Sequence, residues 1–351
     1  MDVYPRPRPS RKQENNNNNN TNANNNAGSR LRPVADALDA VGFPSKGDKT
    51  LLEHKAQKDF YDKIVDRYMR FCSRNSHDLE AAWASLPASA SADATKNPPA
   101  NLPVRPRAQA PPQNEDADSL VAKTAKLSLG PQKPTRDERQ QSPAVELSTL
   151  LMSLRKLREG LLATASTTPV TFQQQVHIFS IRFSILAHHP PSYFSSLRYL
   201  LESLHTSTHP LTPPQLTEFT SYLILDYACR QNSFAAAYAL LVESKEKHGF
   251  QSPVVEQVLT ALTHDNWVSF WRIHKGVDGY VRAVMGWATE NVIRQALKAV
   301  GRTYLSVNLN WLLTNCTGDE DWTWEGLAEK ERLGWDREGD TIIIRRPKPK
   351  Q

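Results

Sequence analysis

The chain has 351 residues, of which 39% are hydrophobic and 23% charged, with a formal net charge of +6. This composition permits one sizeable core with some chain left over. The cysteines Cys72, Cys229 and Cys316 are far apart, which argues against a disulfide-stapled secreted domain and for reduced thiols. The longest apolar run, at 234–242, is about half the length of a membrane span. We therefore expect a soluble protein of the cytoplasm, the nucleus or both, with no membrane contact.

Residues 1–48 are predicted to be a disordered, asparagine-rich tail. Arginine and proline alternate at 5–9, and asparagine tracts follow at 15–20 and 24–26. Segments of this kind bury too little apolar surface to offset their chain entropy. The basic residues are either part of a solvated tail or a patch that contacts RNA or an import receptor.

An amphipathic helical arm is predicted over residues 49–86. Apolar side chains recur at intervals of three and four over 51–72, which places an aromatic stripe on one face of a helix. A shorter helix follows at 78–86. This face either docks on the chain's own helical domain or inserts into another subunit. In the second case the candidate protein-interface residues are Phe60, Ile64, Tyr68 and Phe71.

Residues 87–141 are rich in Pro, Ala, Ser and Gln, so we predict a disordered, extended linker. A small apolar cluster at 120–129 is either a docking motif or a chance grouping. A helical domain is predicted over 142–276, beginning at Ser142-Pro143, a favourable helix start. Its short amphipathic helices are separated by Pro-rich or polar turns. Such helices must pair and stack, which predicts a repeat-like array of TPR-like helical hairpins.

The last segment, residues 277–351, is predicted to form a winged helix. Three helical patterns come first, and the turn at 338–340 then separates two strand patterns, of which the second is the β-branched run 341–345. Three helices and a hairpin are the element order of a winged helix. The helical patterns cover 280–304, 309–313 and 324–333. The fold class is therefore mainly α: stacked helical hairpins, a C-terminal winged helix and a largely disordered N-terminal region.

No catalytic motif is found in the sequence: there is no phosphate loop, no dinucleotide fingerprint and no nucleophile elbow. His188, His189, His205 and His209 are predicted to be loop residues, since no third ligand type lies near them in the sequence. The carboxylates at 319–321 are interpreted as negative charge at a helix N-terminus. We therefore expect a non-enzymatic protein with no cofactor, no metal and no small-molecule substrate.

Basic residues are numerous in the terminal segment. A third helix with a basic hairpin is the geometry that winged helices use on duplexes. Glutamates at 325, 329 and 331 share that helix and would repel phosphates, so weak RNA contact is favoured over sequence-specific DNA binding. The candidate nucleic-acid contacts are Arg302, Lys330, Arg345, Arg346, Lys348 and Lys350.

The helical patterns at 172–186 and 194–204, with residues 265–271, 296–307 and 339–345, resemble the PCI domain. The resemblance is to its small-subunit branch: subunit eight of the signalosome, its proteasome-lid counterpart and subunit k of translation initiation factor three. It implies a non-catalytic scaffold subunit whose partners are other PCI-type subunits. It also implies an exposed sheet edge at the protein interface. The residues expected there are Trp335, Ile342, Ile343 and Ile344.

Residues 218–225 are similar to a segment of the GANP-type proteins, which serve mRNA export and processing. That resemblance implies a different class of function, an RNA-binding adaptor. The two alternatives share a helical stack with a terminal winged helix, and they differ in whether the terminal segment contacts protein or RNA.

Overall fold

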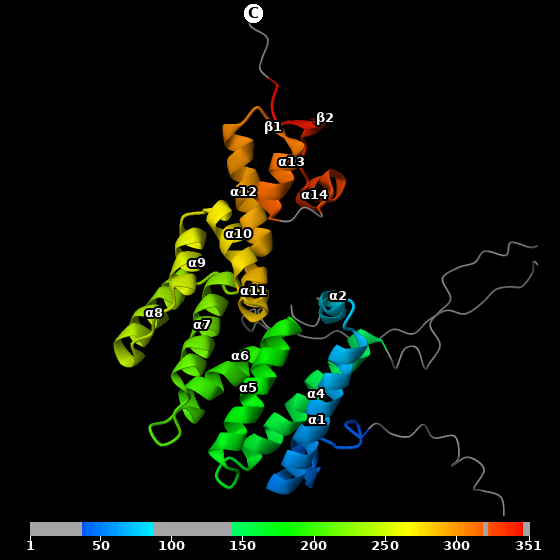
Figure 1. The fold of residues 1–351 in the computed structure, drawn as a ribbon, viewed down its shortest axis with the longest axis vertical. Helices are drawn as coiled ribbons and strands as arrows, with labels where there is room; N and C mark the ends of the chain where they lie inside the picture. Colours follow the sequence, from blue (N-terminus) through cyan, green and yellow to red (C-terminus); the bar gives the residue numbers. More distant parts are fainter. Residues whose placement is uncertain (1–36, 87–141, 319–321, 347–351) are drawn as a thin grey trace, which may run out of the picture.

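The computed structural model of the chain describes residues 37–86, 142–318 and 322–346. Over these ranges the protein is mainly helical, as expected, and one small sheet lies near its carboxyl-terminal end (Figure 1). None of the described helices is long and apolar enough to cross a membrane. The helices are α1 (His54–Arg74), α2 (Leu79–Ala84), α4 (Pro143–Ala163), α5 (Val170–Leu186), α6 (Pro190–Tyr199), α7 (Pro213–Cys229), α8 (Phe234–His248), α9 (Pro253–Thr263), α10 (Trp267–Gly276), α11 (Gly279–Met285), α12 (Thr289–Thr303), α13 (Leu309–Leu312) and α14 (Trp324–Glu331).

Local capping residues determine where many of these helices begin. Helices α4, α6, α7 and α9 each have proline in the first turn, where its missing N–H costs no hydrogen bond. Thr212 and Gln215 form a reciprocal capping box at the start of α7. At the other end, α8 stops at Gly249, which adopts a left-handed conformation with φ of 60°. The starts of α4, α7 and α9 are those that the prolines in the sequence predicted.

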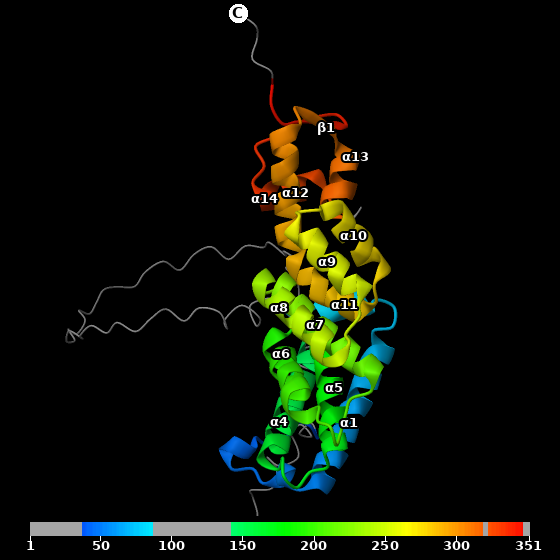
Figure 2. The same cartoon turned by 90° about the vertical axis from the view of Figure 1, so that its left-hand side faces the viewer.

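The helices follow one another along the long axis of the molecule (Figure 2). Consecutive helices pack against each other in the pairs α5 with α6, α7 with α8, and α9 with α10. One hydrophobic cluster runs through the stack, from Ile181 of α5 to Ile342 in the terminal sheet. The terminal segment is therefore packed on the stack through a shared core.

The N-terminal arm packs on the chain's own helical stack. Helix α1 lies along α4, and the two helices share a second hydrophobic cluster. Phe60, Ile64 and Phe71 are buried in this cluster, and Tyr68 is half-buried against it. Of the two arrangements that the sequence left open, the structure shows the first. The assignment of these four residues to an interface with another subunit is corrected, because α4 and α5 already cover their side chains.

Residues 37–48 also differ from expectation. They were predicted to belong to a disordered tail, but they form turns that pack on α4, and Leu38 is buried. The signal was missed because the partner of Leu38 lies more than a hundred residues along the chain: the Lys156 ammonium donates to its carbonyl over 3.1 Å. The rest of the predicted tail, 1–36, and the predicted linker, 87–141, lie outside the described residues.

Helices α11 and α12 replace the single long helix predicted at 280–304, and the 3₁₀ turn Gly286–Ala288 joins them. Strands β1 (Ser306–Asn308), β2 (Asp336–Glu338) and β3 (Thr341–Ile343) then form an antiparallel sheet in the order β1-β3-β2. Strand β3 was predicted and β1 was not. In the register, Val307 of β1 and Arg337 of β2 both lie opposite Ile342 of β3.

Candidate interaction surface

The strand predicted to be an exposed edge lies in the middle of the sheet. Both sides of β3 are paired, one with β1 and the other with β2. Ile342 is fully buried, and Ile343 and Ile344 are half-buried. The assignment of these three isoleucines to an edge interface is therefore corrected. The two free edges of the sheet belong to β1 and β2.

Trp335 is half-buried against its own chain. A Cβ atom added at Gly301 of α12 would lie 3.1 Å from Cζ2 of the indole, so the glycine permits the close approach. Trp335 thus helps to fix the hairpin on α12, and most of its surface is already used in this contact.

The free edge of β2 is lined with paired charges. The Arg337 guanidinium lies 3.0 Å from the Glu325 carboxylate, and Arg346 lies 3.1 Å from Glu338 and 3.6 Å from Asp336. Charged side chains on an edge strand disfavour pairing with another chain, because they would lose water on association. This edge is chemically protected.

The free edge of β1 carries no charged residue within the strand, which is Ser306, Val307 and Asn308. The Leu305 carbonyl accepts a hydrogen bond from Ile344 N–H over 2.8 Å, and Leu309 N–H donates to the Asp340 carbonyl over 2.8 Å. Main-chain groups of successive residues in an antiparallel strand alternate in direction. Ser306 therefore directs its N–H and C=O, and Asn308 its N–H, away from β3 toward the open side; the Asn308 carbonyl belongs to the first turn of α13.

Three large exposed side chains surround that open side. Tyr304 is 48%, Leu305 54% and Trp311 39% exposed, and the rings of Tyr304 and Trp311 lie 6.0 Å apart. A cluster of exposed apolar groups beside unpaired main chain is typical of a protein-binding edge. We call Tyr304, Leu305, Ser306, Asn308 and Trp311 the β1 edge patch. The sequence analysis missed this patch because Tyr304 and Leu305 precede β1 and Trp311 follows it, and a strand of three residues gives no recognisable pattern.

The four candidate nucleic-acid contacts that the structure describes do not form one cationic surface. Lys330 Nζ lies 3.0 Å from the Glu290 carboxylate, and Arg346 is paired on β2. The Arg345 guanidinium donates to the main-chain carbonyl of Arg302 over 2.7 Å. The Arg302 side chain itself is exposed at the end of α12. Lys348 and Lys350 lie outside the described residues.

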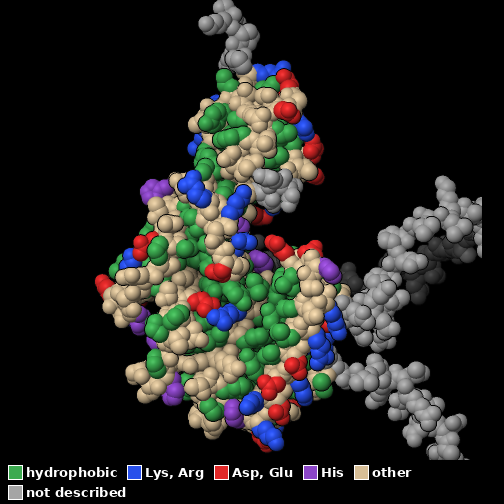
Figure 3. Space-filling view, viewed as in Figure 1, with side chains coloured by type: hydrophobic (Ala, Val, Ile, Leu, Met, Phe, Trp, Pro, Cys, Tyr) green, Lys and Arg blue, Asp and Glu red, His purple; other side chains and the backbone are tan. Residues whose placement is uncertain are grey.

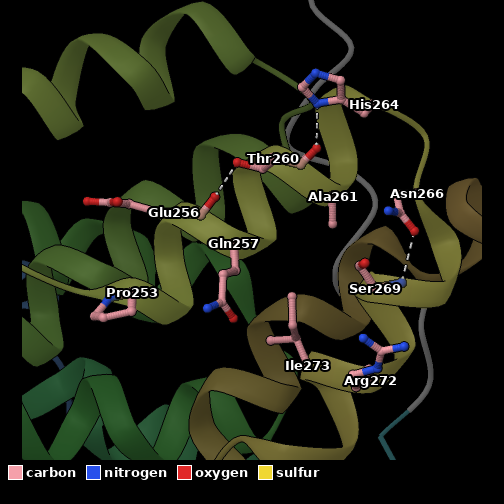
Figure 4. Close-up of a pocket in the computed structure, with 10 residues that line it drawn as sticks. All are labelled: Pro253, Glu256, Gln257, Thr260, Ala261, His264, Asn266, Ser269, Arg272 and Ile273. Atoms are coloured by element: carbon pink, nitrogen blue, oxygen red, sulfur yellow. Dashed lines mark hydrogen bonds between the residues drawn. The ribbon is translucent and has the colours of Figure 1, made fainter.

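A polar pocket of about 770 Å³ lies between α9 and α10 (Figure 4). Its hydrogen bonds are those of ordinary helix ends: Asn266 Oδ1 accepts from Ser269 N–H over 3.0 Å, and His264 Nδ1 lies 2.9 Å from the Thr260 carbonyl. The Glu256 carboxylate is paired with Lys245 at 2.6 Å. No nucleophile and base face each other in this arrangement, so the pocket offers no catalytic pair.

The histidines and cysteines of the described ranges form no metal site. No group of three or more His, Cys, Asp or Glu side chains there could hold an ion. Burial lowers the pKa of His188, whose ring packs on Trp287 at 5.7 Å. Burial also raises the pKa of Cys316 to about 12, so this thiol stays protonated and unreactive.

Comparison with known proteins adds no relative: no family model matches the chain, and no curated protein matches it. Function must therefore be argued from the surfaces described above. Among them, the β1 edge patch combines unpaired main chain with exposed aromatic side chains.

Proposed function

We propose that this protein is a non-catalytic scaffold subunit of a multi-subunit, PCI-type complex, and that the β1 edge patch contacts a neighbouring subunit. The element order α12, β1, α13, α14, β2, β3 and the strand order β1-β3-β2 support a winged helix. The paired helices α5 to α10 support a stack of TPR-like hairpins that carries it. The proposal places the protein in the cytoplasm, the nucleus or both.

The observation that carries the proposal is the difference between the two edges of the sheet. The β2 edge bears three ion pairs, whereas Leu305 and Trp311 beside the β1 edge are exposed and uncharged. Edge strands without charges are templates for another strand.

The chemistry of the patch defines the partner as an extended protein segment. The outward N–H and C=O of Ser306 and the N–H of Asn308 would give the hydrogen bonds of an added strand, and Trp311 would give buried aromatic area. Tyrosine and tryptophan dominate the energetics of many protein interfaces. No catalytic step is part of this role, which agrees with the ordinary capping bonds in the α9–α10 pocket.

The experiment is affinity purification of the tagged chain from its native cells, with mass spectrometry of the proteins recovered. The proposal expects other PCI-type subunits in stoichiometric amounts. The variant Trp311→Asp should lose them, because a carboxylate in the patch would be desolvated on binding. The matched control is Tyr238→Asp, which changes a similarly exposed aromatic residue on α8. A wild-type chain recovered alone would contradict the proposal.

The RNA-binding adaptor is tested by titration with RNA at two salt concentrations. Phosphate contacts make affinity fall steeply with salt. Because Lys330 and Arg346 are already paired with carboxylates, the scaffold proposal expects weak binding that the variant Arg302→Ala barely changes. Tight, salt-sensitive binding that is lost when residues 345–350 are removed would favour the adaptor instead.

A further inference from the structure

A groove lined by aromatic rings lies between α1, α5 and α11, distant from the β1 edge patch. Its volume is about 440 Å³. Figure 3 shows hydrophobic side chains gathered over this part of the molecule, between α11 and α1. The rings that line it belong to Tyr61, Tyr68, Phe179, Phe183 and Tyr280. We call this feature the aromatic groove.

Aromatic rings of the groove contact one another edge to face. The ring of Phe179 meets that of Tyr68 at a centroid distance of 5.4 Å and an interplanar angle of 83°, and that of Tyr61 at 5.8 Å and 88°. Edge-to-face contacts of this kind are favourable and leave ring faces available to a ligand. Tyr68, Phe179 and Tyr280 are half-buried, so part of each ring remains accessible.

Polar side chains also line the groove: Thr171, Gln174, Gln175 and Gln215 are uncharged, and Arg182 is paired. Both nitrogen branches of the Arg182 guanidinium bond to the Glu218 carboxylate, at 2.9 and 2.7 Å. The side-chain oxygen of Gln215 accepts a hydrogen bond from Thr212 N–H. Its side-chain N–H₂ group makes no hydrogen bond within the described ranges. The groove thus offers aromatic faces and an amide donor, without a free charge.

These features fit a polyproline II peptide. Such a helix has no internal hydrogen bonds, so its carbonyl groups are free to accept from amide donors. Its proline rings pack on aromatic faces, and its conformation is already restricted before binding.

The chain contains such a segment at 98–112. Six of these fifteen residues are proline, and Pro103 and Pro106 have the P-x-x-P spacing that aromatic grooves recognise. The segment lies outside the described residues. No acidic residue falls within it, so nothing in it repels the Glu218 carboxylate.

The segment is tethered close to the groove. Helix α2 packs at its rim: the Trp83 ring lies 6.2 Å from that of Tyr68 and 5.3 Å from that of Phe183. The described chain stops three residues later, at Leu86. Pro98 is twelve residues further on, a reach of about 40 Å when extended. A tether of this length gives a local concentration on the order of millimolar.

We propose that the aromatic groove is a polyproline-binding site and that residues 98–112 of the same chain occupy it. A second role follows for the arm formed by α1 and α2. It contributes Tyr61 and Tyr68 to the groove, and it places the start of the proline-rich segment at the groove's rim.

The test uses a labelled synthetic peptide of residues 97–113 and fluorescence anisotropy. The peptide is titrated with the intact chain and with a full-length variant in which 97–113 is replaced by a Gly/Ser sequence of equal length. The proposal expects the replaced chain to bind the peptide at least about tenfold more tightly, because the intact chain's own segment competes at millimolar local concentration. A peptide with all six prolines changed to alanine should not bind.

Groove variants are made in the replaced chain. Tyr280→Ala should weaken peptide binding at least about tenfold, and the control Tyr238→Ala, on α8, should not change it. Circular dichroism checks that both variants are folded. No binding to the replaced chain would overturn the site. Equal binding to the intact and replaced chains would overturn the occupant and leave the groove to a proline-rich segment of another protein.

Discussion

The indole N–H of Trp271 donates a hydrogen bond to the main-chain carbonyl of Cys316 over 3.2 Å. This bond joins α10, near the end of the helical stack, to the π-helical segment Leu313–Thr317 of the terminal segment. Gly318 follows, with φ of 74°, and a Cβ atom there would overlap the Trp271 ring. The position of the terminal sheet on the stack therefore depends on Trp271 and on the absence of a side chain at 318.

Gly318→Ala is predicted to lower the free energy of unfolding by about 2–4 kcal/mol. The methyl group would overlap the indole, and the left-handed backbone conformation is unfavourable for alanine. Thermal and urea unfolding measure the change. The control is Gly334→Ala, where an added Cβ meets no atom within 4 Å. Equal losses in the two variants would show that the Trp271 contact is not what restricts position 318.

Asp226→Ala is predicted to cost about 3–5 kcal/mol of stability. The fully buried Asp226 carboxylate accepts from the Tyr193 hydroxyl, from Arg230 at 2.7 and 2.8 Å and from Gln231 at 2.8 Å. Removing it leaves a guanidinium and a phenol without their partner. Urea unfolding gives the value. Glu202→Ala, which breaks an exposed pair with Arg198, should barely change the midpoint, and an Asp226 variant that behaved the same way would refute this account.

His177→Gln is predicted to reduce the pH dependence of stability. Burial, with the nearby Arg158 charge, lowers the pKa of His177 to about 3. The folded state keeps this imidazole neutral, whereas the unfolded chain binds a proton below its ordinary pKa of 6.5. The contribution of His177 to the free energy of unfolding is therefore present above pH 6.5, and it falls by about 2 kcal/mol between pH 7 and pH 5.

The measurement is urea unfolding of wild type and His177→Gln at several pH values, with His209→Gln as the exposed control. The wild type and the control should lose stability toward pH 5 more steeply than His177→Gln. All three proteins should still lose some stability toward pH 5, since burial also lowers the pKa of His188 and His189. Identical slopes for all three proteins would contradict the prediction.

Ile64→Ala is predicted to lower the free energy of unfolding by about 2–4 kcal/mol, because Ile64 is fully buried between α1 and α4. Met69→Ala is the control: its side chain is on the same helix and is 60% exposed. Two similar, small effects would indicate that α1 does not dock on the stack. In that case the other arrangement of the arm, insertion into another subunit, would regain support.

The sequence predicted the features that depend on neighbouring residues. Proline positions and apolar spacing gave the helices of the stack. Features that depend on distant partners were either left open, as was the docking of α1 on the chain's own helical domain, or missed, as was β1. Helix α1 packs on α4, although residues 87–141 separate the two helices in the sequence. Strand β1 is too short to produce a recognisable sequence pattern.

The candidate interface could be predicted only in part. The sequence assigned it to the terminal sheet, but strand order depends on long-range pairing, so Ile342 to Ile344 were assigned to an edge although β3 lies in the middle of the sheet. Exposure of Tyr304 and Trp311 is likewise set by what the fold leaves uncovered, which local spacing does not record.

The most direct test of the β1 edge patch is amide hydrogen exchange on the free chain and on the purified complex. If another strand pairs with β1, the outward N–H groups of Ser306 and Asn308 should exchange at least about tenfold more slowly in the complex. The outward amide of Arg337 on the protected β2 edge should be unchanged. Unaltered exchange at Ser306 and Asn308 in the complex would contradict the central claim.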